Sequence, residues 1–325
     1  MGNHDYDKAW KEIDSLEQQG LPKSALEKTE ALLEIARREN VPAQIVKALI
    51  YRGKYQSQLE EEGLANAIFR LQQEAEKAEF PVKPVLQSML AEMFSSYMDN
   101  NYWRFRERTQ TADFKPEDIR TWTLEQLTNE AAKYHWLAVS NENTKGVGIE
   151  NFKPILTEGR NEEGLRPTLY DFLAHRAIDF FMNERTYLTQ PAYKFYIDDA
   201  QAFAKAEDFI KWQITSKDTA SQKLQTLRLM QKLLAFRMQE RERHSASLLD
   251  ADLKRLRFVH QNAVIDTKDE LYMRALQDLQ KKYEDSPFVA EVKYEIASFY
   301  YTKGSDWQPV PLGSPSGAGG GGDDR

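Results

Sequence analysis

Apolar residues recur at spacings of three and four along most of this chain, with polar residues between them, which is the pattern of amphipathic α-helices. In the first hundred residues, Pro and Gly interrupt this pattern and divide it into short helices. We predict these helices at 6–19, 24–40, 43–62, 64–79 and 83–98, with Ser24 as the cap of the second. The sequence has no long alternating run rich in β-branched residues, so it predicts no strands.

The clearest single helix lies near the midpoint, at 166–181. Thr168 and Asp171 form a capping box, in which each side chain accepts a hydrogen bond from the backbone N–H of the other. We therefore expect a helix that begins at about Leu169, with apolar positions over roughly half of its circumference, wider than the stripe of a one-sided surface helix. These apolar positions are Leu169, Leu173, Ala177 and Phe180, flanked by Tyr170, Ala174 and Phe181. Such a helix belongs in the core, where neighbours cover it on two sides.

The second half of the chain returns to regular helical spacing. We predict helices at 200–217, 220–243, 248–264, 268–283 and 288–303. Ser286 is the expected N-cap of the last one, with Pro287 at its first helical position. The small and aromatic residues around this Ser-Pro turn resemble a tetratricopeptide helix pair.

Between the two regular halves, the stretch 100–164 has less even spacing. We predict one long helix there, which begins near Pro116 and runs from Ile119 to about Val139, kinked after Thr123. The polar segments 141–148 and 161–164 contain Gly and are predicted to be loops. The whole stretch is therefore an irregular helical connection.

A weak internal repeat links the first helices. Val41-Pro42 recurs as Phe80-Pro81, and the apolar run 45–50 matches 85–90 at an offset of about forty residues. Repeats of this length mark tetratricopeptide-like or HEAT-like solenoids, and their short links force adjacent helices antiparallel. The predicted fold class is therefore all-α: an α-solenoid of antiparallel helix pairs, tetratricopeptide-like, with a flexible Gly/Pro-rich tail. Its parts are N-terminal helical repeats at 5–99, the irregular connection at 100–164, C-terminal helical repeats at 165–304 and a disordered tail at 305–325.

The amino-acid composition argues against several classes of function. Hydrophobic residues make up 41% and charged residues 29%, as in a soluble globular protein. The net charge of −7 offers no global attraction for nucleic acid or an anionic membrane. The absence of cysteine from the sequence removes disulfides, thiol catalysis and thiolate zinc sites. No signal peptide and no membrane-spanning apolar run occur, so we expect the chain to stay where it is made unless an export signal has been trimmed.

Three metal-ligand side chains lie on the helix at the midpoint. Asp171, His175 and Asp179 are spaced four apart and form one stripe. Over eight residues at about 1.5 Å each they span about 12 Å, which is too far for all three to bind one ion. We therefore favour a polar stripe that faces solvent or a neighbouring helix over a metal site.

Neither the remaining histidines nor a search for catalytic motifs indicates a catalytic site in this sequence. His135 stands between two aromatic residues and is predicted to pack in the core, while His244 and His260 lie in charged helical surfaces and His4 in a mobile N-terminus. The sequence contains no nucleophile elbow, phosphate loop, dinucleotide fingerprint or HExxH motif. We predict no catalytic residue, no metal ligand and no cofactor, and the binding residues stay unknown.

Many aromatic residues lie on predicted helices. Examples are Trp103, Trp122, Trp136, Tyr193, Tyr196 and Trp212. We favour packing between helices for them. The alternative is that some line a concave groove for a peptide or another domain, as solenoids often provide.

Several stretches resemble one known family. They are 20–27, 42–52, 80–92, 113–122 and 166–181. They are similar to the helical region that precedes the macroglobulin domains in very large bacterial alpha-2-macroglobulin-like proteins of Gram-negative envelopes. The resemblance covers most of 5–304, and Leu-Tyr-Asp-Phe-Leu-Ala-His-Arg at 169–176 is its most specific part.

The resemblance implies an exported, periplasmic, membrane-tethered family, some members of which trap proteases with a thioester and a bait region. This chain has neither cysteine nor macroglobulin domains, so the protease-inhibitor chemistry is not carried over. What it implies is a non-catalytic N-terminal fragment of the cell envelope, a scaffold that binds its own downstream domains or envelope proteins, with no nucleic acid and no membrane insertion. The alternative is a free-standing tetratricopeptide-like adaptor in the cytoplasm. A helical metal-dependent enzyme is a third reading, which rests on the stripe at Asp171 alone.

Overall fold

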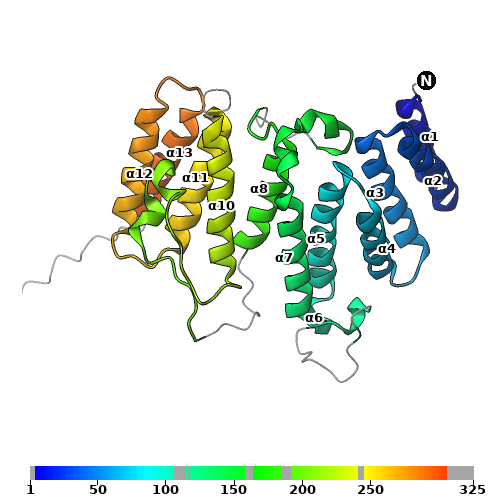
Figure 1. Ribbon diagram of the computed structural model, residues 1–325, viewed down its shortest axis with the longest axis horizontal. Helices are drawn as coiled ribbons and strands as arrows, with labels where there is room; N and C mark the ends of the chain where they lie inside the picture. The colour runs from blue at the N-terminus through cyan, green and yellow to red at the C-terminus, as the bar shows by residue number, and fades with distance from the viewer. Residues whose placement is uncertain are drawn as a thin grey trace, which may run out of the picture.

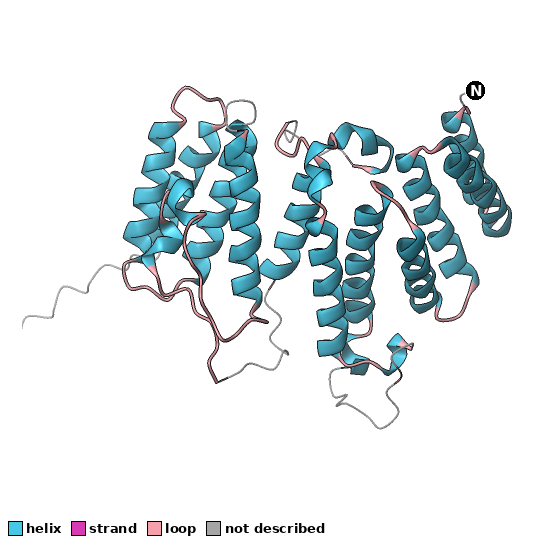
Figure 2. Cartoon of the chain, in the orientation of Figure 1, coloured by secondary structure: helices cyan, strands magenta, loops and turns pink. Residues whose placement is uncertain are grey.

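The computed structural model describes residues 4–105, 115, 118–157, 164–183, 192–240 and 245–305. Within these ranges every regular element is a helix, which confirms the all-α prediction (Figures 1 and 2). Two isolated bridges, Gly148 with Thr168 and Ile197 with Ala263, add no sheet. The longer helices lie side by side along the long axis, mostly in chain order, and the last one returns beside the helix before it, so the molecule is an elongated, solenoid-like stack (Figure 1). None of the helices in this described part is long and apolar enough to cross a bilayer.

The first half of the stack contains six helices. They are α1 (Tyr6–Gln18), α2 (Pro22–Glu39), α3 (Pro42–Leu59), α4 (Gly63–Lys77), α5 (Val82–Asn100) and the short α6 (Tyr102–Phe105). Pro22 and Pro42 open α2 and α3, since a proline at the first position loses no helical hydrogen bond. Ser24 therefore lies inside α2, and the prediction that it caps this helix is wrong. Asn40 ends α2 in the left-handed conformation, at φ 53°.

The irregular connection contains one long helix, but it begins later than predicted. The structure has a 3₁₀ turn η1 (Ile119–Thr121), then α7 (Leu124–Ser140) and the 3₁₀ segments η2 (Glu142–Gly146) and η3 (Ile149–Ile155). Thr123 forms a capping box with Gln126, whose side chain accepts from the Thr123 N–H at 2.8 Å. A capping residue is not itself helical. The prediction of a continuous helix from Ile119 is therefore wrong, because Thr123 is the N-cap at which α7 begins and not a kink within one helix. Pro116 lies outside the described residues.

The predicted core helix is α8 (Leu169–Met182). Its capping box is confirmed: the Thr168 N–H donates to Asp171 Oδ2 at 2.9 Å, and the Asp171 N–H donates to Thr168 Oγ1 at 3.3 Å. Leu173 and Ala177 are fully buried. α8 packs against α7 on one side and against α10 (Gln222–Gln239) on the other, so the expected coverage on two sides is also confirmed.

The remaining elements form the other end of the stack. They are η4 (Ala200–Phe203), α9 (Ala206–Phe209), α10, α11 (Ser245–Asn262), α12 (Lys268–Lys282) and α13 (Val289–Ser305). Ser286 and Pro287 lie in the turn before α13, where the Ser286 hydroxyl accepts from the Phe288 N–H at 3.3 Å. Pro287 is therefore not at the first helical position. The predicted tail beyond Ser305 lies outside the described residues.

The predicted helix at 200–217 is wrong. Only the short η4 and α9 form there, and the chain from 212 to 216 has no regular structure. The Arg255 guanidinium donates to the carbonyls of Ala202 at 2.5 Å and Ala204 at 2.9 Å. The Gln231 amide donates to the carbonyl of Phe209 at 2.8 Å. Side chains of α10 and α11 thus occupy carbonyl groups that would otherwise accept hydrogen bonds within a helix. Contacts with these two neighbouring helices therefore decide the conformation of the segment.

Candidate functional site

The polar stripe of α8 begins with a buried ion pair. Asp171 Oδ1 lies 3.1 Å from Arg237 Nε on α10, and each residue is 1% exposed. The N–H is not aligned for a hydrogen bond, so the contact is a charge pair. Burial lowers the pKa of Arg237, and the charge of Asp171 opposes that shift. The pair ties α8 to α10.

The other two residues of the stripe face α11. His175 Nδ1 lies 3.4 Å from Lys254 Nζ, and the same ammonium lies 2.5 Å from Asp179 Oδ1. Burial, followed by the positive charges of Lys254 and Arg166, holds the pKa of His175 well below its usual value. The neutral imidazole can therefore accept a hydrogen bond from Lys254. The stripe contacts neighbouring helices, which was one of the two orientations favoured from sequence.

The stripe does not converge on a point. Its members use separate partners on two helices, and among the described residues no three His, Cys, Asp or Glu side chains are placed to hold one metal ion. Contacts between helices therefore account for the stripe of these three side chains along α8.

Two of the remaining histidines are buried or half-buried. His135 is 1% exposed and packs against aromatic rings of α8, as predicted. His260 lies half-buried instead of on an open surface: its ring stacks on Tyr272 at 4.2 Å and its Nε2 lies 2.7 Å from Asp269. His244 lies outside the described residues. These contacts hold helices together.

The aromatic residues singled out from sequence divide into two groups. Trp122, Trp136 and Trp212 pack against core rings, with centroids 5.9, 6.3 and 6.2 Å from Phe94, Phe181 and Phe209. Trp103, Tyr193 and Tyr196 are exposed by half or more. The packing interpretation is therefore right for the first three, and the exposed three line none of the hollows described next.

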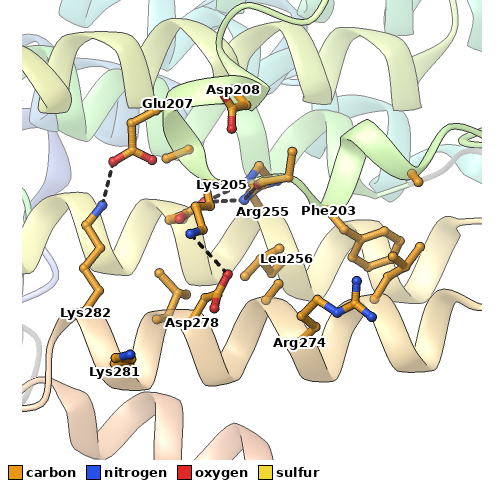
Figure 3. A pocket seen from close by; sticks show the side chains of 17 residues that line it. Phe203, Lys205, Glu207, Asp208, Arg255, Leu256, Arg274, Asp278, Lys281 and Lys282 are labelled. Atoms are coloured by element: carbon orange, nitrogen blue, oxygen red, sulfur yellow. Dashed lines mark hydrogen bonds and ion pairs between the residues drawn. The ribbon is translucent and has the colours of Figure 1, made fainter.

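One hollow of the described residues is a cleft of about 890 Å³ between the η4–α9 segment, α11 and α12 (Figure 3). Phe203, Leu256 and Leu279 give it an apolar floor. Arg255 belongs to the same lining and pairs with Asp252 at 2.7 Å, and both side chains are buried. Since the Arg255 guanidinium is engaged by that carboxylate and two carbonyls, it holds the fold together.

The rim of this cleft carries charges of both signs that bind one another. Lys282 Nζ lies 2.9 Å from Glu207, and Lys205 Nζ lies 3.6 Å from Asp278, so two ion pairs join its walls (Figure 3). The hydrogen bond from Lys282 lowers the pKa of Glu207. The lining contains neither a hydroxyl nor an imidazole side chain, so no Ser–His type of pair faces this cleft.

A second hollow lies in the first half of the stack and has a different character. It is a groove of about 380 Å³ bounded by α3, α4, α5 and Arg176 of α8, which we call the α3–α5 groove. Its apolar walls are Leu49, Ile50, Leu64, Ala67, Leu71, Met89 and Met93. Ile50 is 39% exposed although it lies among these side chains. The groove is therefore an open apolar surface on helices that are otherwise well packed.

The charged residues of the α3–α5 groove are mostly cations. The lining contains Arg52, Lys54, Arg70 and Arg176 but a single carboxylate, Glu92. Each cation is paired with a carboxylate: Arg52 with Glu74 at 2.8 Å, Lys54 with Glu17 at 2.5 Å, Arg70 with Glu60 at 2.7 Å, and Arg176 with Glu92 of the lining at 3.4 Å. The hydrogen bond from Arg70 lowers the pKa of Glu60. The cations are thus fixed in place around the apolar walls.

Sequence reasoning left the binding residues open and did not find this groove. Two signals for it were present: Ile50, which is apolar next to the buried Leu49, and Gly53 in the interior of α3. Neither is decisive alone, because the groove forms only when three helices are placed together.

Comparison with known proteins gives no information on the family or the function of this chain. Family models, curated proteins and solved structures each gave no match to this chain. The resemblance to the alpha-2-macroglobulin-like proteins therefore stays a prediction from the sequence stretches named above.

Proposed function

We propose that this chain is a non-catalytic helical scaffold that binds a segment of another protein or of further domains in its own polypeptide. The observation that carries the proposal is the α3–α5 groove, an open apolar surface on ordered helices. Exposed apolar surface gains roughly 25 cal/mol for each Å² that a partner covers.

The non-catalytic part of the proposal is supported by what the polar groups do. Asp171, His175 and Asp179 are engaged with α10 and α11. The cleft beside α12 is bridged by ion pairs of its own walls. These groups stabilise helix packing, and a binding role needs no reactive group.

A photo-crosslinking residue tests the proposal. Benzoylphenylalanine in place of Ile50, in the full chain, should yield a specific protein adduct in an extract of the cells that make this protein. The matched control places the same residue at Phe69, which is 52% exposed on α4 but outside the groove lining. An adduct at position 50 that Gly53→Glu abolishes, with none at 69, supports the proposal. No adduct at 50, or equal adducts at the two positions, would overturn it.

The place of the scaffold in the cell is proposed from the family resemblance. We assign it to the envelope as the helical segment ahead of macroglobulin domains, with those domains or envelope proteins as partners. The five similar stretches support this, above all 169–176. Sequencing the coding region on both sides tests it: an upstream signal peptide and downstream macroglobulin domains are expected. A stop near Arg325 in an unprocessed gene would contradict it and favour the cytoplasmic adaptor.

A further inference from the structure

The two arms of the stack meet mainly at α8. We call α1 to α8 the first arm and η4 to α13 the second arm. Within the described residues, α8 packs along α10, and its polar stripe reaches α11 (Figure 1). We call this contact of α8 with α10 and α11 the junction. A contact of this kind between two folded parts is where an elongated molecule can move without unfolding.

The junction is rich in buried polar groups. Asp171 and Arg237 form an ion pair between α8 and α10, and both side chains are buried. His175 is 2% exposed and faces α11. The buried Ser247 hydroxyl of α11 donates to the carbonyl of Gly164, just before α8, at 2.9 Å. A buried ion pair contributes little net stability, because both charges lose their water. Such an interface is held less firmly than an apolar one of the same size.

The packing between α5 and α7, inside the first arm, has a different character. Phe94 of α5 stacks on Tyr134 of α7 with ring centroids 5.8 Å apart. Leu90 and Leu127, one on each helix, are fully buried. Contacts of this kind involve no change of charge between pH 7 and pH 5. Acid therefore acts on the junction before it acts on this interface.

His175 is the group of the junction on which acid acts. Its Nδ1 lies 3.4 Å from Lys254 Nζ, and its Nε2 lies 3.8 Å from Asp250 Oδ2, both on α11. Burial, and then the positive charges of Lys254 and Arg166, lower the pKa of His175, so the closed junction disfavours the imidazolium. When the junction opens, water reaches the ring and its pKa returns to about 6.5.

The other titratable groups on α8 and on the helices around it have contacts of their own. They are Asp171 with Arg237 of α10, Asp179 with Lys254 of α11, Arg176 with Glu92 of α5, and His135 of α7 against Phe180. Among the described groups with which α8 faces the second arm, His175 is the one whose ordinary pKa lies between pH 5 and pH 8. The response of the junction to mild acid therefore depends on this ring.

We infer that uptake of a proton by His175 opens the junction, so that α8 parts from α10 and α11 while each arm stays folded. The scaffold then has two shapes, a closed stack and an open one. Below pH 6.5 the open shape takes up a proton that the closed shape does not, so acid shifts the population toward the open shape.

A single buried thiol measures the opening, because the sequence contains no cysteine. Ser247→Cys places the thiol at the junction. The rate at which a small reagent modifies it, divided by the rate in denaturant at the same pH, gives the open fraction. Between pH 7 and pH 5 this fraction should rise by up to about 25-fold, the ratio that a pKa of about 6.5 in the open shape allows.

Ser95→Cys is the matched control for global unfolding. Ser95 is buried in α5, and its hydroxyl donates to the Ala91 carbonyl of its own helix, so this thiol reports loss of the first arm itself. At each pH the open fraction at 247 should exceed that at 95 by at least about tenfold, because the junction opens without unfolding either arm.

Two matched histidine variants, each made in the Ser247→Cys chain, assign the proton. His175→Gln keeps an acceptor for Lys254 but takes up no proton, and should abolish the rise at 247. His260→Gln makes the same change within the second arm, where His260 contacts Asp269 and Tyr272 of α12, and should leave the rise intact.

Every outcome decides the inference. A rise at 247 that His175→Gln removes and His260→Gln keeps, with position 95 still protected, supports it. No rise at 247, or equal open fractions at 247 and 95, overturns it. A rise that persists in His175→Gln, or that both histidine variants remove, also overturns it. The comparison of the two thiols stands even if His175→Gln fails to fold, since it uses chains in which His175 is unchanged.

Discussion

Two hollows in the described part of the chain differ in the character of their walls. The cleft between η4, α11 and α12 is the larger of the two, at about 890 Å³, yet two ion pairs join its walls and Arg255 is buried in the fold. The α3–α5 groove is smaller, at about 380 Å³, but its walls are mainly apolar, and its four cations are each paired with a carboxylate. The size of a hollow is therefore a poor guide to binding, and exposed apolar surface is a better one.

The largest expected effect tests the structural role of the cleft. Arg255→Ala should lower the free energy of unfolding by about 3 kcal/mol or more, because it leaves Asp252 and two carbonyls buried without their donor. Thermal unfolding of the full chain measures the loss. Arg274→Ala, an exposed residue of the same lining, is the control and should change stability by less than about 0.5 kcal/mol. Equal effects of the two variants would refute a buried structural role for Arg255.

The two glycines of the groove region should respond in opposite directions. Gly63→Ala should destabilise the protein by about 1–3 kcal/mol, because its Cβ would clash with the backbone of Ser57. Gly53→Ala should stabilise it by up to about 1 kcal/mol, since it gains helix propensity without a clash. Melting temperatures of the two variants check this. A loss of stability in Gly53→Ala would contradict the open space around this position.

His175 should make the junction between the two halves sensitive to pH. Its folded-state pKa lies well below 6.5, so below pH 6.5 the unfolded chain takes up a proton that the folded protein does not. Stability from this group is therefore present above pH 6.5 and falls as the pH drops, by at most about 1.4 kcal/mol per pH unit.

Chemical denaturation between pH 5 and 7 measures this slope, with His175→Gln as the comparison. Carboxylates with a lowered pKa, such as Glu60 and Glu207, change the stability mainly at pH values below this range. An unchanged slope in His175→Gln would assign the pH dependence to other groups.

The smallest expected effect is at the rim of the cleft. Lys282 and Glu207 are each about two-fifths exposed, and ion pairs of this kind contribute less than about 1 kcal/mol. A double-mutant cycle with Lys282→Ala and Glu207→Ala should return a coupling in that range that fades with added salt. A coupling of several kcal/mol would show that the rim pairs hold the cleft shut.

Helix positions could be predicted from sequence wherever local chemistry sets them. Pro42 opens α3, and the capping boxes at Thr123 and Thr168 start α7 and α8. The Thr168 box was recognised from sequence, while the one at Thr123 was taken for a kink. These signals work because the atoms involved lie within a few residues of one another.

The segment 200–217 shows where such reasoning stops. Its residues have helical spacing, but Arg255 and Gln231, which are distant in sequence, donate to its carbonyls. No pattern within the segment contains that information.

By itself, the sequence determined that this protein is a stack of helices, which helix lies in the core and that Asp171, His175 and Asp179 share a face. The spacing of apolar residues and the caps are enough for that, because they act within one helix. Tertiary structure alone decided that this face binds α10 and α11, and that α3, α4 and α5 leave a groove beside Gly53. A groove is a property of the space between helices, and that space depends on contacts between residues far apart in the chain.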